Sequence, residues 1–180
     1  MIGILVCGPS GVGKTSNLSK LFTDIGTHEL ELFDPDKRPE KSQEERSTKT
    51  RQEVLDAIEE KKEFVYSGSC LRGKAIQEIL EKMNQQGYTI IMAILYTSVD
   101  TALKRILQRE QKVPDTIVKT FHRLFKSKAE QYMNNPLIDK VFLYNNETKF
   151  KLILDKQEKK IHCHANESFY FDISSYCDST

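Results

Sequence analysis

The sequence has no long hydrophobic run, and its charges nearly cancel. The longest apolar stretch, from Ile90 to Leu95, is far too short to cross a bilayer, which takes about 20 apolar residues in a helix. The net charge is only +1 over 180 residues, so no overall electric field favours nucleic acid or an acidic membrane. These two absences argue against a membrane-spanning protein and against one that follows a nucleic acid over a long surface.

Cysteine is scarce and follows no metal-binding or redox spacing. The four cysteines, Cys7, Cys70, Cys163 and Cys177, include no Cys-x-x-Cys pair. Cys7 and Cys70 lie in segments with the pattern of buried strands, so we expect free thiols in a reducing compartment. The first residues already form a strand pattern, with no basic region or cleavage site, so we expect no signal peptide. The predicted location is the cytoplasm.

Internal repeats and low-complexity linkers are also absent. A chain of 180 residues suits one domain with a full hydrophobic core. We therefore expect a single domain over residues 1–180, with its core at 1–146 and a C-terminal hairpin and tail at 147–180.

Segments of strand length alternate with helical patterns through the expected core. Ile76, Ile79, Leu80 and Met83, for example, have the spacing of one helix face, and Gly87 ends that helix. Alternation of this kind requires crossover connections and a parallel sheet covered on both faces. The sequence thus predicts a three-layer α/β fold with a mainly parallel five-stranded sheet. The expected strands are 2–7, 30–33, 64–67, 89–96 and 140–144.

The last part of the chain has a different pattern. Apolar residues alternate over 150–154, a polar turn follows at 155–159, and a second strand pattern covers 161–165, which together predict an appended β-hairpin. His162 and His164 would share one strand face. Two histidines without a third ligand nearby favour surface residues over a metal site.

A glycine-rich segment follows the first expected strand. Residues 8–15 read Gly-Pro-Ser-Gly-Val-Gly-Lys-Thr, a complete G-x-x-x-x-G-K-[ST] phosphate loop, and an amphipathic segment follows at 18–22. The amides of such a turn and the dipole of the next helix face a phosphate group. Lys14 is expected to reach the β- and γ-phosphates of ATP, and Thr15 to ligate Mg²⁺. The expected nucleotide-binding residues are Gly8, Pro9, Ser10, Gly11, Val12, Gly13, Lys14, Thr15 and Ser16.

Two aspartates follow the second expected strand, which we place beside the first strand. Ligands of open α/β sheets bind where the strands end, and here the chain reads Asp34-Pro35-Asp36. Either carboxylate has the chemistry to orient an acceptor hydroxyl or to hold a water of the Mg²⁺ shell. The alternative is a turn in which aspartate only caps the chain. The residues by themselves favour neither.

Positive charge is concentrated in the helices after the fourth expected strand. Arg105 and Arg109 lie in the first of them, and Lys119, Arg123 and Lys126 lie in the second. Kinases place arginines in a lid that covers the phosphates and excludes water. The alternative is a solvated basic helix face.

The order of these elements resembles the zeta-toxin-like branch of P-loop kinases, a group related to the kinase domain of phage polynucleotide kinase. The resemblance covers nearly the whole chain, and order and spacing carry it more than any one segment besides the phosphate loop. The matching segments are Gly8–Thr15, Asp34-Pro35-Asp36, Phe64–Ser69, Gly87-Tyr88, the helix with Arg105 and Arg109, Val113-Pro114 and Tyr144-Asn145-Asn146.

This resemblance implies transfer of the γ-phosphoryl group of Mg-ATP to a hydroxyl of a small molecule, such as a nucleotide, nucleoside or nucleotide sugar. It implies that Asp36 is the catalytic base, that Arg109 is a lid arginine, and that Arg123 is a second lid position. The family usually has a glutamate at the end of the third strand, where this chain has Ser67, and Ser69 keeps the hydroxyl of the family's threonine. The expected substrate residues are Asp34, Arg38, Ser67 and Ser69.

Two other functions stay open at this point. One is a nucleotide-binding ATPase or switch that acts through a protein partner, which the missing carboxylate at Ser67 favours. The other is a 5′-end polynucleotide kinase, in which a short basic patch at 119–128 holds a strand end. The partners expected for the leading hypothesis are ATP and a small-molecule acceptor, with no membrane.

Overall fold

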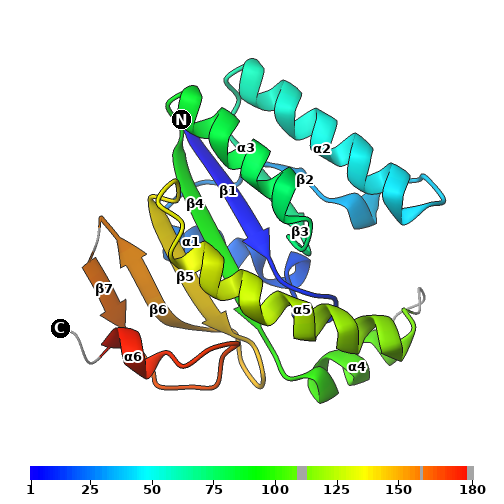
Figure 1. Ribbon diagram of the computed structural model, residues 1–180, viewed down its shortest axis with the longest axis vertical. Coiled ribbons are helices and arrows are strands. Elements are labelled where there is room, and N and C mark those ends of the chain that lie inside the picture. The colour runs from blue at the N-terminus through cyan, green and yellow to red at the C-terminus, as the bar shows by residue number, and fades with distance from the viewer. Residues whose placement is uncertain (109–112, 159, 178–180) are drawn as a thin grey trace.

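The computed structural model describes residues 1–108, 113–158 and 160–177, and in these ranges seven strands form one sheet (Figure 1). The strand order is β2-β3-β1-β4-β5-β6-β7. The pairs from β2 to β5 are parallel, and β6 and β7 are antiparallel to their neighbours. The strands are β1 Ile2–Cys7, β2 Glu31–Phe33, β3 Phe64–Gly68, β4 Thr89–Tyr96, β5 Lys140–Asn145, β6 Lys151–Gln157 and β7 Lys160–Cys163.

Helices cover both faces of the sheet, with α1 behind it and α3 and α5 in front in Figure 1. Successive side chains of β1 point to opposite faces, so Ile4 and Val6 pack with α1 while Leu5 packs with α2, α3 and α5. Among the described residues, no helix combines the length and the apolar character that a membrane span requires. The helices are α1 Leu18–Ile25, α2 Gln43–Glu59, α3 Gly73–Gln85, α4 Val99–Leu107, α5 Asp115–Met133 and α6 Ser174–Cys177.

The predicted parallel core is confirmed, with one correction to its order. β1 lies between β3 and β4 and is fully buried from Ile4 to Cys7, as expected for a central strand. The prediction that β2 lies beside β1 is wrong, because β3 is inserted between them. β2 is only three residues long, and as the edge strand it needs just one hydrogen-bonded neighbour.

The predicted hairpin exists, but it belongs to the sheet. The expectation of a five-stranded sheet is therefore wrong, because β6 pairs with β5 and extends the sheet to seven strands. The expected turn at 155–159 also begins too early, since β6 continues to Gln157, which pairs with Lys140. The free backbone groups along β5 explain both differences, because a strand buried against a core needs partners on both edges.

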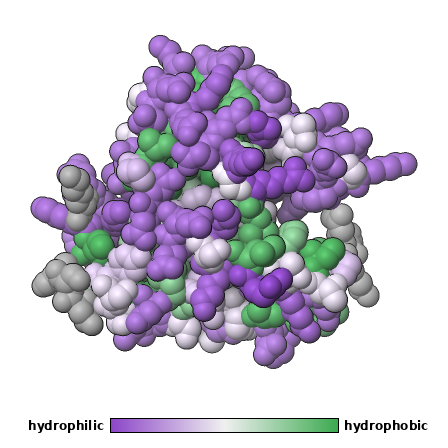
Figure 2. Space-filling model, in the orientation of Figure 1, coloured by the Kyte–Doolittle hydropathy of each residue, from purple (hydrophilic) through white to green (hydrophobic). Residues whose placement is uncertain are grey.

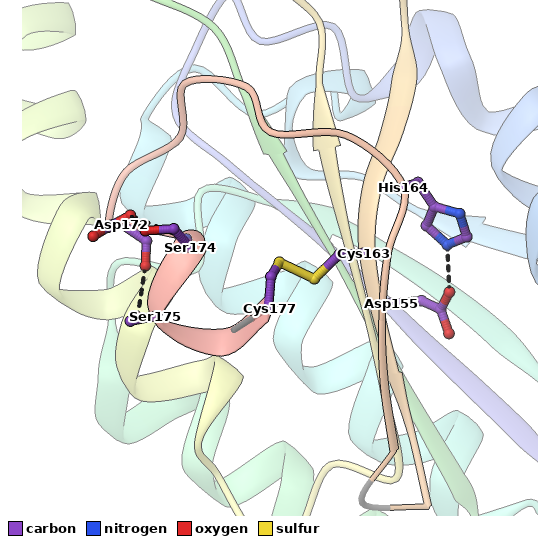
Figure 3. Close-up of a disulfide and its surroundings, with 7 residues drawn as sticks. All are labelled: Asp155, Cys163, His164, Asp172, Ser174, Ser175 and Cys177. Atoms are coloured by element: carbon purple, nitrogen blue, oxygen red, sulfur yellow. Dashed lines mark hydrogen bonds and ion pairs between the residues drawn. A yellow bond between two sulfur atoms is a disulfide. The ribbon is translucent and has the colours of Figure 1, made fainter. Parts of the chain in front are cut away.

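The prediction of free thiols is wrong. Cys7 is joined to Cys70, and Cys163 to Cys177, by disulfide bonds. Parallel pairing places Cys7 opposite Gly68, two residues before Cys70, so the first two sulfurs meet although 63 positions separate them. The second bond ties α6 to the end of β7, as Figure 3 shows.

Candidate active site

The phosphate loop connects the end of β1 to a 3₁₀ turn at Thr15–Asn17, which leads into α1. Gly11 and Gly13 have φ angles of +85° and +87°, a left-handed conformation that favours glycine. A side chain at Gly13 would also collide with the amide of Asn146. The ammonium group of Lys14 donates hydrogen bonds to the carbonyls of Gly8, at 2.7 Å, and Pro9, at 3.2 Å. The loop thus has the backbone geometry that the motif predicts.

Two side chains from distant segments hold the loop in place. Asn146 Nδ2, after β5, donates to the carbonyl of Val12 at 2.8 Å. The guanidinium of Arg105, on α4, donates to the carbonyls of Gly11, at 3.3 Å, and Asn146, at 2.6 Å. Arg105 therefore supports the loop from the side. The sequence singled out Asn146 only as part of a matching segment.

His122 is a third contact to the loop, from α5. Its Nε2 lies 3.3 Å from the carbonyl of Ser10, and the residue is buried. Burial lowers the pKa of His122, the hydrogen bond to Ser10 opposes this shift, and Lys14 adds to it. The lowered pKa favours the neutral form of His122.

Glu147 joins the ends of β4 and β5. Its carboxylate accepts hydrogen bonds from the amide of Ser98, at 2.6 Å, and from the hydroxyls of Thr97, Ser98 and Thr101. Burial by itself raises the pKa of Glu147, but these hydrogen bonds together lower it to about 2. The sequence predicted no role for this residue, since its partners lie almost 50 positions away.

Asp34 caps a turn, which is one of the alternatives that the sequence left open, and it also contacts the phosphate loop. Its Oδ1 accepts a hydrogen bond from the amide of Asp36 at 2.9 Å and so caps the short helix Pro35–Lys37. Its Oδ2 accepts a hydrogen bond from the hydroxyl of Thr15 at 3.2 Å. Both oxygens of Asp34 are thus engaged, and one of them touches the expected metal ligand of the phosphate loop.

A small cavity of about 60 Å³, which we call the P-loop pocket, lies where β1, β2 and β3 end. It brings together six of the predicted site residues from three segments. Ser67, in its wall, is 1% exposed, and its hydroxyl has no hydrogen-bond partner among the residues that the structure describes. The predicted residues in the lining are Ser10, Lys14, Asp34, Asp36, Ser67 and Ser69.

Tyr66 is a lining residue that the sequence did not indicate. Burial raises its pKa to about 12, the nearby carboxylates of Asp34 and Asp36 contribute to the increase, and Arg72 opposes it. The phenol therefore keeps its proton at neutral pH. Phe121, from α5, also lines this pocket.

Two of the arginines with predicted roles, Arg38 and Arg123, do not line this pocket. Arg38 turns toward α2, where its Nε donates to the hydroxyl of Thr50 at 3.2 Å and its guanidinium forms an ion pair with Glu53. Arg123 lines a separate groove beside Tyr96. Arg109 lies outside the described residues. The roles assigned to these arginines stay predictions.

The donor set fits Mg²⁺, which binds oxygen ligands. The hydroxyl of Thr15 and the carboxylate of Asp34 offer an oxygen pair beside the phosphate loop. In the described part of the chain, no group of three or more His, Cys, Asp or Glu residues is arranged for a metal ion. His162 and His164 instead contact the carboxylate of Asp155, at 3.1 and 2.7 Å, and Figure 3 shows the second contact.

A protein-family model described as "Zeta toxin" matches residues 27–158. The matched range begins after the phosphate loop, so the family match and the loop geometry are separate observations. A search of curated protein sequences finds no match.

Three solved structures with the same fold come from two protein pairs, AvrRxo1-ORF1:-ORF2 and PezAT. The AvrRxo1-ORF1:-ORF2 complex has a TM-score of 0.67 and 12% identity, covering 90% of this chain and 60% of that chain. Its form with ATP has a TM-score of 0.66 at the same identity and coverage. A structure from the PezAT toxin-antitoxin system of Streptococcus pneumoniae has a TM-score of 0.61 and 14% identity. The match covers 88% of this chain and 73% of that chain. At these identities the similarity shows a shared fold, and this chain spans 60% of the AvrRxo1 chain.

Proposed function

Because the chain belongs to the zeta toxin family of P-loop kinases, we propose that it transfers the γ-phosphoryl group of ATP to a hydroxyl of a small molecule. The proposed acceptor classes are nucleotides, nucleosides and nucleotide sugars. One observation carries the proposal: Asp36 and Lys14 line the same pocket at the mouth of the phosphate loop. A base beside the phosphate-binding lysine is the arrangement that in-line phosphoryl transfer needs.

Each residue then has a distinct task. Lys14 stabilises the charge on the transferred group, and Thr15 with Asp34 would hold Mg²⁺, which neutralises charge between the β- and γ-phosphates. The acceptor oxygen forms a bond to the γ-phosphorus while the bond from that phosphorus to ADP breaks. The proton of the acceptor hydroxyl moves to the carboxylate of Asp36.

We assign the proton transfer to Asp36 because the oxygens of Asp34 are already engaged. Oδ1 of Asp34 caps the Pro35–Lys37 turn, and Oδ2 contacts Thr15. Asp36 follows two residues later and lines the P-loop pocket. A base must reach the hydroxyl proton directly or through one water, and the position of Asp36 in the pocket supports this role.

Ser67 bears on the charge of the acceptor. It stands where the family usually has a carboxylate, and its buried hydroxyl has no partner among the described residues. An uncharged wall repels an anionic acceptor less than a carboxylate does, and the hydroxyl is able to donate a hydrogen bond to it. We therefore favour an acceptor that carries a phosphate group.

The test is a panel of candidate acceptors with γ-labelled ATP. Asp36→Asn should lower transfer about 10²–10⁴-fold while ATP still binds, because general-base catalysis is worth that much. Asp56→Asn, on the exposed side of α2, is the matched control. Transfer that continues at full rate in Asp36→Asn would rule out the proposed base.

Two observations are compatible with the other two functions, the ATPase or switch and the 5′-end polynucleotide kinase. The similar AvrRxo1 and PezAT structures are named as assemblies of two proteins, which is compatible with an ATPase or switch that acts through a partner. ATP hydrolysis without transfer to any acceptor in the panel would favour that function. Lys119, Arg123 and Lys126 line one groove, which suits a 5′-end polynucleotide kinase. That function requires binding to an oligonucleotide that weakens strongly with salt.

We also propose that the protein works in the cytoplasm, where ATP is available. Its two disulfides are uncommon in that compartment. Cell fractionation followed by detection of the protein tests the location, and recovery outside the cytoplasmic fraction would contradict it.

A further inference from the structure

Every carbonyl of the phosphate loop from Gly8 to Gly13 has a side-chain partner at hydrogen-bonding distance. The loop and the turn after it supply the partners at both ends. Lys14 reaches the first two carbonyls, and Asn17 donates to the last one at 2.7 Å. The three carbonyls in between are contacted from other parts of the fold. These pairs are Ser10 with His122, Gly11 with Arg105, and Val12 with Asn146.

The contact of His122 with Ser10 identifies the tautomer of the imidazole ring. A carbonyl oxygen is only able to accept a hydrogen bond, so Nε2 of His122 carries the proton in this contact. The lowered pKa of His122 favours the neutral ring, which has one N–H group to donate. His122 thus acts as a neutral donor, as the amide of Asn146 does.

These carbonyl contacts bear on where the loop amides point. A peptide group is planar, and its carbonyl and the N–H group of the next residue point in opposite directions. A carbonyl that is held from outside the loop therefore turns the following N–H group inward. The amides of Gly11 and Gly13 follow the carbonyls that contact His122 and Asn146. Neither amide donates a hydrogen bond to another residue in the part of the chain that the structure describes, which leaves both for an anion.

The loop also packs tightly against the elements that carry these donors. A Cβ atom at Gly11 would collide with the backbone of Ala102 on α4, and one at Gly13 would collide with the amide of Asn146. His122 and Asn146 are 5% and 8% exposed, and neither lines the P-loop pocket. They are therefore placed to support the loop from behind rather than to touch a ligand in that pocket.

We propose that His122, Arg105 and Asn146 are positioning residues, which hold the phosphate loop in its anion-binding shape before ATP arrives. They act on the triphosphate group through the loop amides. Donors that are already oriented need no reorganisation when charge develops on the transferred group. The inference deepens the proposed kinase function and rests on it for turnover, whereas its effect on phosphate binding is measurable without transfer. Arg105 is charged, so the two neutral residues give the cleaner test.

The first experiment measures the binding of inorganic triphosphate by calorimetry, because this probe carries no nucleobase. Asn146→Leu removes the donor to Val12 at similar size and should weaken binding about 2–10-fold, the value of one neutral hydrogen bond. The affinity for ATP should fall by the same factor. Unchanged triphosphate affinity in a folded Asn146→Leu protein, or a loss confined to ATP, would overturn the inference for this residue.

The matched control for this experiment is Asn166→Leu, at an exposed position. Most of the surface in Figure 2 is hydrophilic, so this variant shows whether an added apolar side chain alone changes the behaviour of the protein. Its triphosphate affinity should equal that of the wild type. An equal loss in both leucine variants would overturn the assignment to Asn146.

Two variants of His122 separate the hydrogen bond from packing. His122→Gln places an amide nitrogen near the position of Nε2 and should keep most of the triphosphate affinity. His122→Leu removes the donor and should lose about 2–10-fold. Thermal unfolding of the same samples shows that each variant is folded, and this pair decides the inference if Asn146→Leu does not fold. An equal loss in both His122 variants would assign the effect to packing and overturn the inference.

Turnover distinguishes a failure of this inference from a failure of the kinase function. With an acceptor that the wild type uses, Asn146→Leu and His122→Leu should raise the KM for ATP and leave the KM for the acceptor unchanged. Wild-type transfer with unaltered kinetics in both variants would overturn the inference and leave the kinase function standing. Donor-dependent triphosphate binding without transfer to any acceptor would contradict the kinase function and leave the positioning residues in place.

Discussion

The hydroxyl of Thr15 donates a hydrogen bond of 3.2 Å to the carboxylate of Asp34. This contact joins the phosphate loop to the end of β2, although β3 separates β2 from β1 in the sheet. Both aspartates line the P-loop pocket, and the contact of Asp34 with Thr15 supports our proposal that Asp34 helps to hold Mg²⁺ while Asp36 takes the proton.

Asp34→Asn should therefore weaken Mg²⁺ binding more than it affects acceptor binding. Loss of a residue that positions a metal ligand typically costs about 10–100-fold in affinity. A Mg²⁺ titration of ATP binding by calorimetry measures the effect without relying on turnover. Asp36→Asn is the comparison and should leave the Mg²⁺ dependence unchanged. An equal shift in both variants would contradict the division of roles.

Lys14→Ala should weaken ATP binding without unfolding the protein. The side chain is only half-buried and contacts loop carbonyls, so its loss leaves the hydrophobic core intact. Thermal unfolding and ATP affinity are measured on the same sample, with exposed Lys74→Ala as the control. Unchanged affinity in a folded Lys14→Ala protein would show that the nucleotide binds elsewhere.

Glu147→Gln should lower the unfolding free energy by about 1–2 kcal/mol at neutral pH, because it weakens hydrogen bonds to a charged acceptor. The pKa of Glu147 falls from 4.5 to about 2 in the folded protein. A depressed carboxyl pKa stabilises the fold above the unfolded value, and the contribution disappears as pH falls through the folded value.

Urea unfolding at a series of pH values from neutral to 2 measures the difference in unfolding free energy between wild type and Glu147→Gln. The gap between wild type and Glu147→Gln should be largest above about pH 4.5 and should close toward pH 2. Glu29→Gln, at an exposed position, makes the same change in charge and should show no such gap. A gap that is constant with pH would mean that the carboxylate charge is not what stabilises this loop.

The two disulfides should contribute unequally to stability. Chain-entropy arguments assign about 4 kcal/mol to a link across 63 positions and about 3 kcal/mol to one across 14. Replacing Cys7 and Cys70 by alanine should therefore cost more in urea unfolding than replacing Cys163 and Cys177. The double variants are compared with and without a thiol reductant. Four reactive thiols in denatured, unreduced wild type would contradict both bonds.

The sequence by itself determined the features that depend on neighbouring residues. The phosphate loop requires glycines, lysine and threonine at fixed local spacing, and the backbone conformation of Gly11 and Gly13 agrees with it. The parallel core was predictable for the same reason, because each strand and helix has its own apolar period. Asp34 was also identified locally, as the residue that ends β2 in a turn.

Only the tertiary structure decided which segments meet. The position of β3 between β2 and β1, the pairing of β6 with β5, and the Cys7–Cys70 bond all join residues far apart in the chain. The same is true of Glu147 and its partners near Ser98, and of Asn146 and the carbonyl of Val12. Periodicity shows which face of an element is apolar but not which other element covers it. These contacts therefore follow from the packing of the whole core, where each choice of neighbour depends on all the others.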